Sequence, residues 1–197
     1  MCIRDRRENP WLEEIEIQDS AHPFSNWNER ITAECYAQNA ASRILDDKGN
    51  IQDIVNNYSK MSFNFGPTLL VWMQQFQPEI YQAIIEADAL SMQNYSGHGA
   101  AMAQAYNPMI MPLANDRDRK TQIAGGIADF ENRFKRKPEG MWLPETAVNT
   151  DCLETLAEAG IKFTILAPRQ AKRVRKIGDK PWNTIKDGGI DTQQPYL

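Results

Sequence analysis

Glu145 is the residue in this sequence that is best placed for nucleophilic or acid–base chemistry. A short apolar run, Met141 to Leu143, precedes it and stops at Pro144, whose missing N–H suits the end of a strand and not its middle. A helix is expected to begin after Asn149 or Thr150. The carboxyl group then stands at the carboxyl end of a strand, where β/α barrels and open α/β sheets place their chemistry. The alternative is an ordinary glutamate in a solvated loop.

The elements that must position Glu145 alternate between strands and helices. Strands are predicted at 61–65, 100–106, 141–143 and 161–166. Helices are predicted at 29–45, at 116–137 and from about 150 to 159, and two more are predicted to begin at Pro67 and at Pro78. A further helical turn is predicted at 53–58. This alternation predicts a parallel α/β sheet or barrel. Because about four strands are too few for a closed barrel, we expect a partial barrel with parallel strands, truncated at both ends.

The clearest predicted helix spans Asp116 to Lys137, with apolar residues at helical spacing on one stripe and Pro138 after its end. Gly125 and Gly126 lie inside it and should each cost about 1 kcal/mol relative to alanine. Close packing of the helix on a sheet would explain their presence.

The composition is that of a globular protein long enough for one ordinary domain, with 197 residues, 42% hydrophobic and 24% charged. A net charge of −4 argues against a general nucleic-acid binder, and we interpret the basic cluster Arg169 to Lys176 as a solvated helix face or loop. No apolar run approaches the ~20 residues that span a bilayer, so no membrane association is expected. The three cysteines, Cys2, Cys35 and Cys152, show no CxxC spacing, which is compatible with a reducing compartment and a cytoplasmic location.

Both ends of the sequence suggest a piece of a longer protein. Residues 1–6 are unrelated to the rest of the chain and resemble a translated sequencing adapter, so we exclude them from the fold and assign 7–197 to one partial catalytic domain. The last residues, 190–197, stop without a helix end or polar tail.

Several stretches together resemble glycoside hydrolase family 57, in particular its α-amylase/α-mannosidase-like branch. They are SFNFGPTLL at 62–70, GHGAAMAQAYNPMIMPLA at 97–114 and GMWLPETA at 140–147, with shorter matches at Arg7–Leu12 and Trp27–Arg30. The resemblance covers nearly all of 7–197 and implies a (β/α)7 barrel that acts on α-linked oligo- or polysaccharides without a cofactor or metal. It also implies that Glu145 is the catalytic nucleophile.

The mechanism implied by this resemblance is retaining hydrolysis or glycosyl transfer through a covalent glycosyl-enzyme. The carboxylate attacks the anomeric carbon while a second, protonated carboxyl group ~5–5.5 Å away gives its proton to the leaving oxygen. In the family that acid is an aspartate of a later motif, which we expect beyond Leu197. Because the chain lacks this acid, we expect the 197 residues alone to show no measurable hydrolysis.

Three other residues are candidates for substrate contact under the same resemblance. Trp142 either borders the sugar site or packs in the barrel. Tyr106 begins a Tyr-Asn-Pro element in which Pro108 stands where the family often has histidine, and this puts a substrate contact in doubt. His98, between two glycines, is a candidate for a sugar-hydroxyl contact or an ordinary loop histidine.

Two other functions are weighed against this hypothesis. A metal-dependent carbohydrate deacetylase on a related barrel needs an aspartate and two histidines at helical spacing, whereas this sequence has only His22 and His98 and no HxxxH. A non-catalytic carbohydrate-binding relative is allowed by Pro108 and disfavoured by Glu145.

Overall fold

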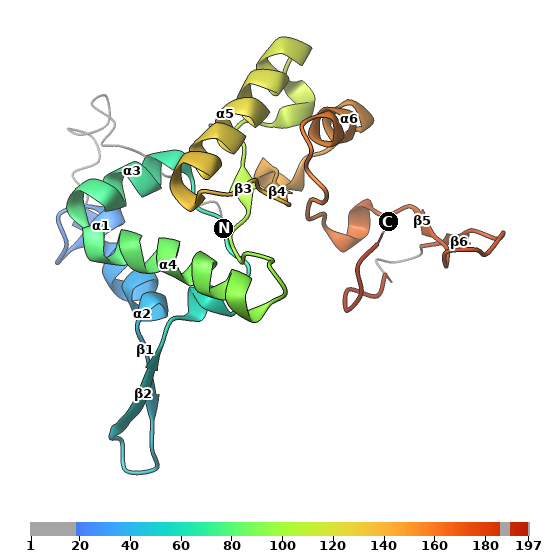
Figure 1. Ribbon diagram of the computed structural model, residues 1–197. Helices are drawn as coiled ribbons and strands as arrows, with labels where there is room; N and C mark the ends of the chain where they lie inside the picture. Colours follow the sequence, from blue (N-terminus) through green and yellow to red (C-terminus); the bar gives the residue numbers. More distant parts are fainter. Residues whose placement is uncertain (1–18, 186–189, 197) are drawn as a thin grey trace.

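The computed structural model describes residues 19–185 and 190–196, which form a mixed α/β chain that is mainly helical (Figure 1). Its helices are α1 (Trp27–Ile31), α2 (Ala37–Ala40), α3 (Pro67–Phe76), α4 (Pro78–Asn94), α5 (Asp116–Phe134) and α6 (Thr150–Glu158). Its strands are β1 (Ser42–Leu45), β2 (Ile51–Val55), β3 (Ala103–Gln104), β4 (Met141–Trp142), β5 (Arg173–Val174) and β6 (Asn183–Thr184). Short 3-10 turns are η1 (Asp19–Ala21), η3 (Asn57–Ser59), η4 (Met111–Leu113), η5 (Pro144–Thr146) and η6 (Pro168–Gln170), and η2 (Thr32–Tyr36) is a π turn.

The four predicted strand segments lie side by side in parallel, in chain order. β3 pairs with β4, with Ala103 opposite Met141 and Gln104 opposite Trp142. Single parallel bridges extend the layer on either side, from Phe63 to Ala101 and from Gly140 to Phe163. Parallel pairing is therefore confirmed, although the segments at 61–65 and 161–166 contribute one bridge each and no ladder.

The barrel expectation is not confirmed. Within the described residues the sheets have two strands each, and the pairs β1–β2 and β5–β6 are antiparallel hairpins that do not join the parallel layer. The expectation was a partial barrel with parallel strands, whereas the described residues form one two-strand parallel ladder with a single bridge on either side. The structure shows a mixed α/β arrangement with short strands.

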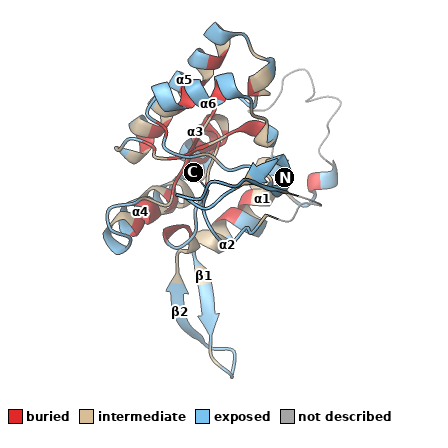
Figure 2. Ribbon diagram, turned by 90° about the vertical axis from the view of Figure 1, so that its right-hand side faces the viewer, coloured by how far each residue is buried: buried red, intermediate tan, exposed pale blue. Residues whose placement is uncertain are grey.

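One face of the parallel layer carries the hydrophobic core. Side chains point to alternate faces along a strand, and the alternate residues Ala101, Ala103, Met141 and Leu143 are all buried in one cluster. Helices α3, α4 and α5 supply much of the rest of that cluster, and α6 and the turns η2, η3 and η4 contribute further residues. Figure 2 shows the buried residues gathered at the centre of the molecule, with the β1–β2 hairpin projecting from it almost fully exposed.

Helix α5 packs directly onto β3 through the two glycines that the sequence placed inside it. A Cβ added to Gly126 would lie 2.0 Å from the Gln104 carbonyl oxygen, and one added to Gly125 would lie 3.2 Å from Tyr106 Cβ. The prediction of close helix–sheet packing is confirmed. The helix ends slightly earlier than predicted, because Lys135 adopts a left-handed φ of 56° and caps it.

We predict that Gly126→Ala destabilises the protein, whereas Gly125→Ala is far milder. Both changes gain up to ~1 kcal/mol of helix propensity. Only Gly126→Ala pushes a methyl group into a backbone oxygen, and forced overpacking typically costs about 1–3 kcal/mol. Urea unfolding of the two variants measures the difference; equal stabilities would show that α5 shifts away from β3 without cost.

The predicted helix at 29–45 is wrong over its last turn. The helical turn predicted at 53–58 is wrong over 53–55, which belong to β2, whereas 57 and 58 lie in the 3-10 turn η3. The helix ends at Ala40, and β1 and β2 follow as a hairpin. Its turn is closed by Asp46, whose Oδ1 accepts from the backbone N–H of Lys48 at 2.9 Å and of Asn50 at 2.7 Å. Gly49 takes a φ of 82°, which its missing side chain permits.

Helix α6 begins as predicted, with the Asn149 side chain accepting from the Cys152 N–H at 2.9 Å. The basic cluster 169–176, predicted as a helix face or loop, contains the end of η6 and β5. Two predicted features, the terminal segment 1–6 and the match at 7–12, lie outside the described residues. In the part of the chain that the structure covers, no helix combines the length and apolarity needed to cross a bilayer.

Candidate active site

Glu145 stands immediately after β4, in the 3-10 turn η5. Leu143 and Pro144 are buried and anchor the start of this turn, whereas Glu145 is exposed. Its position at the carboxyl end of a parallel strand is the one predicted from the sequence.

The backbone at this point adopts an uncommon conformation. Glu145 has φ 57° and ψ 17°, and Thr146 has φ 53°, so two consecutive residues with side chains lie in the left-handed region. The turn is closed by backbone hydrogen bonds from Thr146 N to Leu143 O (3.0 Å) and from Ala147 N to Pro144 O (3.1 Å). Non-glycine residues in this region are disfavoured and cluster at functional sites.

The Glu145 carboxylate makes no hydrogen bond or ion pair with any residue that the structure describes. Only the backbone carbonyl of Glu145 is engaged, by the Thr146 hydroxyl at 2.7 Å. An exposed carboxylate without an internal partner is able to approach a bound ligand.

Trp142 lies on the face of the parallel layer opposite the core. Its neighbours in β4, Met141 and Leu143, are fully buried among the helices, so Trp142 points to the other side, where it is half-buried. Its partner in the ladder, Gln104, is half-buried too and accepts a hydrogen bond from Asn64.

Tyr106 lies two residues beyond the end of β3, at the same edge of the layer as Glu145. Its backbone N–H donates to Gln122 O of α5 at 3.1 Å, and the next residue, Asn107, donates its N–H to the Gln122 side chain at 2.8 Å. The side chain of Tyr106 is exposed. The Tyr-Asn-Pro element is thus fixed to α5 where it leaves β3.

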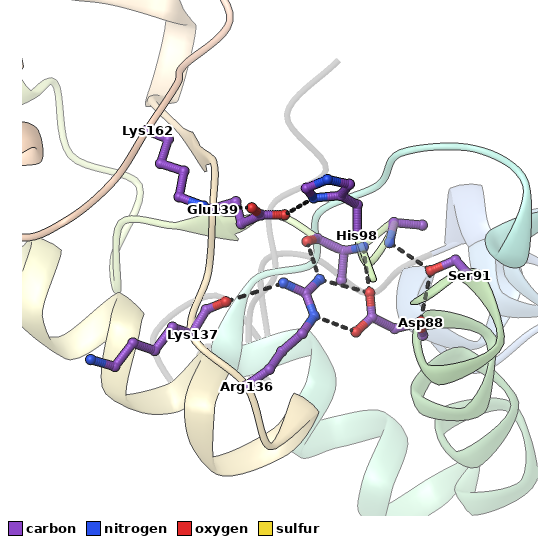
Figure 3. Close-up of polar contacts among 9 residues, drawn as sticks. Asp88, Ser91, His98, Arg136, Lys137, Glu139 and Lys162 are labelled. Atoms are coloured by element: carbon purple, nitrogen blue, oxygen red, sulfur yellow. Dashed lines mark hydrogen bonds and ion pairs between the residues drawn. The ribbon is translucent and has the colours of Figure 1, made fainter. Parts of the chain in front are cut away.

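His98 lies at the opposite edge, before the strand segment that contains β3 (Figure 3). Its Nδ1 is 2.8 Å from an oxygen of Glu139, and the other oxygen of that carboxylate accepts from Lys162 Nζ at 2.8 Å. Glu139 directly precedes the start of the β4 segment, and Lys162 lies at the start of the next one. Tyr106 and Glu145 thus follow β3 and β4 at one edge of the layer, and His98 lies at the other edge.

The Glu139 contacts predict a pH dependence of stability. Hydrogen bonds from Lys162 and then His98 lower the pKa of Glu139 from 4.5 to about 2. A lowered pKa stabilises the fold above pH 4.5, and this contribution is lost as the pH falls towards 2. Because the His98 and Lys162 side chains are 66% and 69% exposed, we expect only about 1 kcal/mol.

Urea unfolding at pH 6 and pH 3 measures this contribution. The loss of unfolding free energy between the two pH values should be about 1 kcal/mol smaller for Glu139→Gln than for the unmodified chain. Identical losses would mean that the three-residue cluster does not stabilise the fold.

A buried ion pair between Asp88 and Arg136 lies next to the cluster of His98, Glu139 and Lys162, and it fixes the start of the strand segment that contains β3 (Figure 3). Asp88 of α4 accepts from Arg136 Nε and from a second Arg136 nitrogen, both at 2.8 Å, and also from the Ala101 N–H at 2.8 Å. Arg136 in turn donates to Ala101 O at 2.8 Å. Ser91 Oγ accepts from the Ala100 N–H at 2.7 Å. These contacts hold the strand against the ends of α4 and α5.

Sequence reasoning missed Asn64, Gln104 and Gln170. Gln170 of η6 donates from Nε2 to the carbonyl of Thr146 at 2.8 Å, across 24 positions of the chain. Asn64 and Gln104 are 40 positions apart. In the sequence, Asn64 and Gln104 are recognisable only as polar residues inside predicted strands. That pattern marks them as unusual but does not show which face of the sheet they occupy.

Within residues 19–185 and 190–196, no group of three or more His, Cys, Asp or Glu side chains is arranged to hold a metal ion. The described cysteines, Cys35 and Cys152, are unpaired.

Comparison with known proteins gives partial sequence matches to two enzymes. Alpha-amylase 1 of Dictyoglomus thermophilum is 28% identical over 107 residues, which are 54% of this chain and 15% of that protein. A 1,4-alpha-glucan branching enzyme of Thermococcus kodakarensis is 42% identical over 48 residues, 24% of this chain and 7% of that protein. The alignments thus span a small part of each curated relative.

A 4-alpha-glucanotransferase from Thermococcus litoralis is a structural match with a TM-score of 0.44 and 20% identity, over 56% of this chain and 17% of that structure. The family model of glycosyl hydrolase family 57 matches residues 3–176, which include the Glu145 turn and all the candidate contacts. The chain therefore belongs to glycosyl hydrolase family 57.

Proposed function

We propose that this chain carries the nucleophile of a retaining glycoside hydrolase or glucanotransferase that acts on α-linked glucans. The observation that carries the proposal is Glu145, an exposed carboxylate without an internal partner among the described residues, at the carboxyl end of β4 and inside the region matched by the family model. The names of the amylase, the branching enzyme and the glucanotransferase support an α-glucan as the substrate class.

In the proposed reaction, a Glu145 oxygen attacks the anomeric carbon and forms an ester bond while the bond to the leaving oxygen breaks. A carboxylic acid protonates that oxygen as it leaves. Water or a glucan hydroxyl group then attacks the same carbon and gives its proton to the carboxylate that the acid left behind. The ester breaks, and Glu145 is released as a carboxylate. Attack by water gives hydrolysis, and attack by a sugar hydroxyl gives transfer.

Two aromatic residues at the carboxyl ends of β3 and β4 suit the binding of a sugar. The apolar CH face of a pyranose stacks on an aromatic ring, and we propose that Trp142 and Tyr106, both at least partly exposed, provide such rings. His98 is engaged with Glu139 at the other edge of the layer, so we propose no sugar contact for it at the Glu145 site.

An activated substrate tests the proposal on this chain directly. In an α-glucosyl or α-maltosyl fluoride the leaving fluoride needs no proton from an acid, so the nucleophile alone decides whether the first step occurs. Because this chain is expected to lack the acid/base carboxyl group, fluoride ion should be released in a burst of about one equivalent per chain, and added azide, which needs no general base, should convert the ester to a glycosyl azide that retains the α configuration. An inverted product, or release no faster than in buffer, contradicts the proposal.

The deacetylase alternative predicts a different outcome. A metal-dependent enzyme loses activity when EDTA removes the ion, whereas fluoride release by Glu145 should be unchanged after EDTA treatment and dialysis. Release of acetate from an acetylated glucan, abolished by EDTA and restored by Zn²⁺, would support the deacetylase.

A further inference from the structure

Asn64 and Gln104 form a pair of amides on adjacent segments of the parallel layer. Asn64 Nδ2 donates to Gln104 Oε1 at 2.7 Å, and both residues are half-buried. The bond turns the Gln104 oxygen towards Asn64 and therefore turns the Gln104 Nε2 away from it. In the described part of the chain this Nε2 has no acceptor, so two N–H donors in a fixed orientation are available.

This amide pair shares a face with Trp142. Gln104 and Trp142 are direct partners in the parallel ladder, where paired side chains point to the same side. The other face at this level is entirely apolar: Ala103 and Met141, also partners, are buried in the core. Glu145 follows Trp142 by three positions. The amides thus lie on the side of the layer that carries the indole ring leading to the candidate nucleophile.

The chemistry of these groups points to an uncharged sugar. An indole ring offers an apolar surface for the CH face of a pyranose, and an oriented amide offers donors for its hydroxyl groups. No cation stands among these residues to select a phosphate or a carboxylate.

We propose that Gln104, oriented by Asn64, and Trp142 form a subsite that binds one neutral α-linked hexose unit beside the unit attacked by Glu145. The identity of the sugar rests on the function proposed above, whereas the place of the subsite rests on the strand register and the amide pair. Gln104 contacts the sugar directly in this assignment, and Asn64 is a positioning residue that acts through Gln104.

Calorimetric titration with maltotetraose tests the subsite without any turnover. Gln104→Met keeps the length of the side chain and removes its donors, and we expect its dissociation constant to rise about 5- to 20-fold. Asn64→Ala leaves the Gln104 donors in place but frees their orientation, so a smaller rise, about 2- to 5-fold, is expected. Gln82→Ala is the matched control, because Gln82 donates to Glu86 on α4, away from the layer, and its affinity should equal that of the unmodified chain.

Urea unfolding of each variant shows whether the amide pair only stabilises the fold; a purely structural role lowers stability and leaves the dissociation constant unchanged. Unchanged affinity in folded Gln104→Met overturns the subsite, and so does the absence of maltotetraose binding to the unmodified chain. Weaker binding in Gln104→Met with no reaction of Glu145 towards a glycosyl fluoride would support the subsite while rejecting the proposed function. The two proposals can therefore fail separately.

Discussion

Replacing Glu145 by glutamine should lower the rate of fluoride release from α-maltosyl fluoride by about 10³-fold or more. Glutamine has nearly the same size and hydrogen-bonding reach, but its neutral amide cannot form the ester on which the reaction depends. Because the Glu145 side chain is exposed and makes no hydrogen bond or ion pair with described residues, the variant should fold as the unmodified chain does. A fluoride electrode measures the rate.

Glu154→Gln is the matched control for this prediction. Glu154 is an exposed carboxylate on α6, a few residues further along the chain, and its change should leave the rate within about twofold. Equal rates for Glu145→Gln and Glu154→Gln would remove Glu145 from the mechanism.

Asp88→Asn should lower the free energy of unfolding by about 3–5 kcal/mol, the largest effect on stability that we expect from a single substitution. The Asp88 and Arg136 side chains are only 2% and 12% exposed. Asparagine leaves the Arg136 guanidinium buried without a countercharge, and it weakens the contact that fixes the Ala101 N–H at the start of the strand segment. Urea denaturation followed by circular dichroism gives the change.

The surface pair Arg30–Glu34 provides the comparison. Its side chains are 30% and 50% exposed, so Glu34→Gln should cost no more than about 0.5 kcal/mol. A loss below about 1 kcal/mol for Asp88→Asn would mean that solvent reaches Arg136 and that the pair does not anchor the strand.

The helices α3 to α6 were predictable because local signals mark them. Pro67 and Pro78 start two of them, Asn149 caps a third, and an apolar stripe runs through α5. Gly126 was informative because glycine weakens a helix, so its presence inside α5 indicated a close approach to another element. The structure shows that approach: any side chain at this position would collide with the Gln104 carbonyl oxygen.

The β1–β2 hairpin was missed because its residues are compatible with a helix in isolation. Arg43, Ile44 and Leu45 continue the preceding helical pattern, and the decisive feature is the Asp46 side chain, which accepts from two backbone N–H groups and reverses the chain. Turn-forming side chains of this kind compete with helix formation. The Asp46–Gly49 segment was recognised as a turn, but the strand after it was assigned to a helix.

The position of Glu145 could be predicted because a strand followed by proline is a local pattern. Its left-handed backbone could not, since glutamate has no preference for that conformation and the surrounding turn imposes it. The contacts of Gln104 and Gln170 join residues far apart in the sequence and depend on which strands become neighbours. His98 lies in a loop, and only the fold shows that this loop meets Glu139 at the edge of the layer opposite to Glu145.

The most direct test of the account is to trap the glycosyl-enzyme and find the residue that carries it. A 5-fluoro-α-glucosyl fluoride reacts at the anomeric carbon with loss of fluoride, and its ring fluorine slows hydrolysis of the ester so that the intermediate accumulates. Mass spectrometry of a peptide digest should show the added glycosyl mass on the peptide containing Glu145, and fragmentation should assign it to that side chain. A label on any other carboxylate, or an unlabelled chain that nevertheless releases fluoride, would contradict the account.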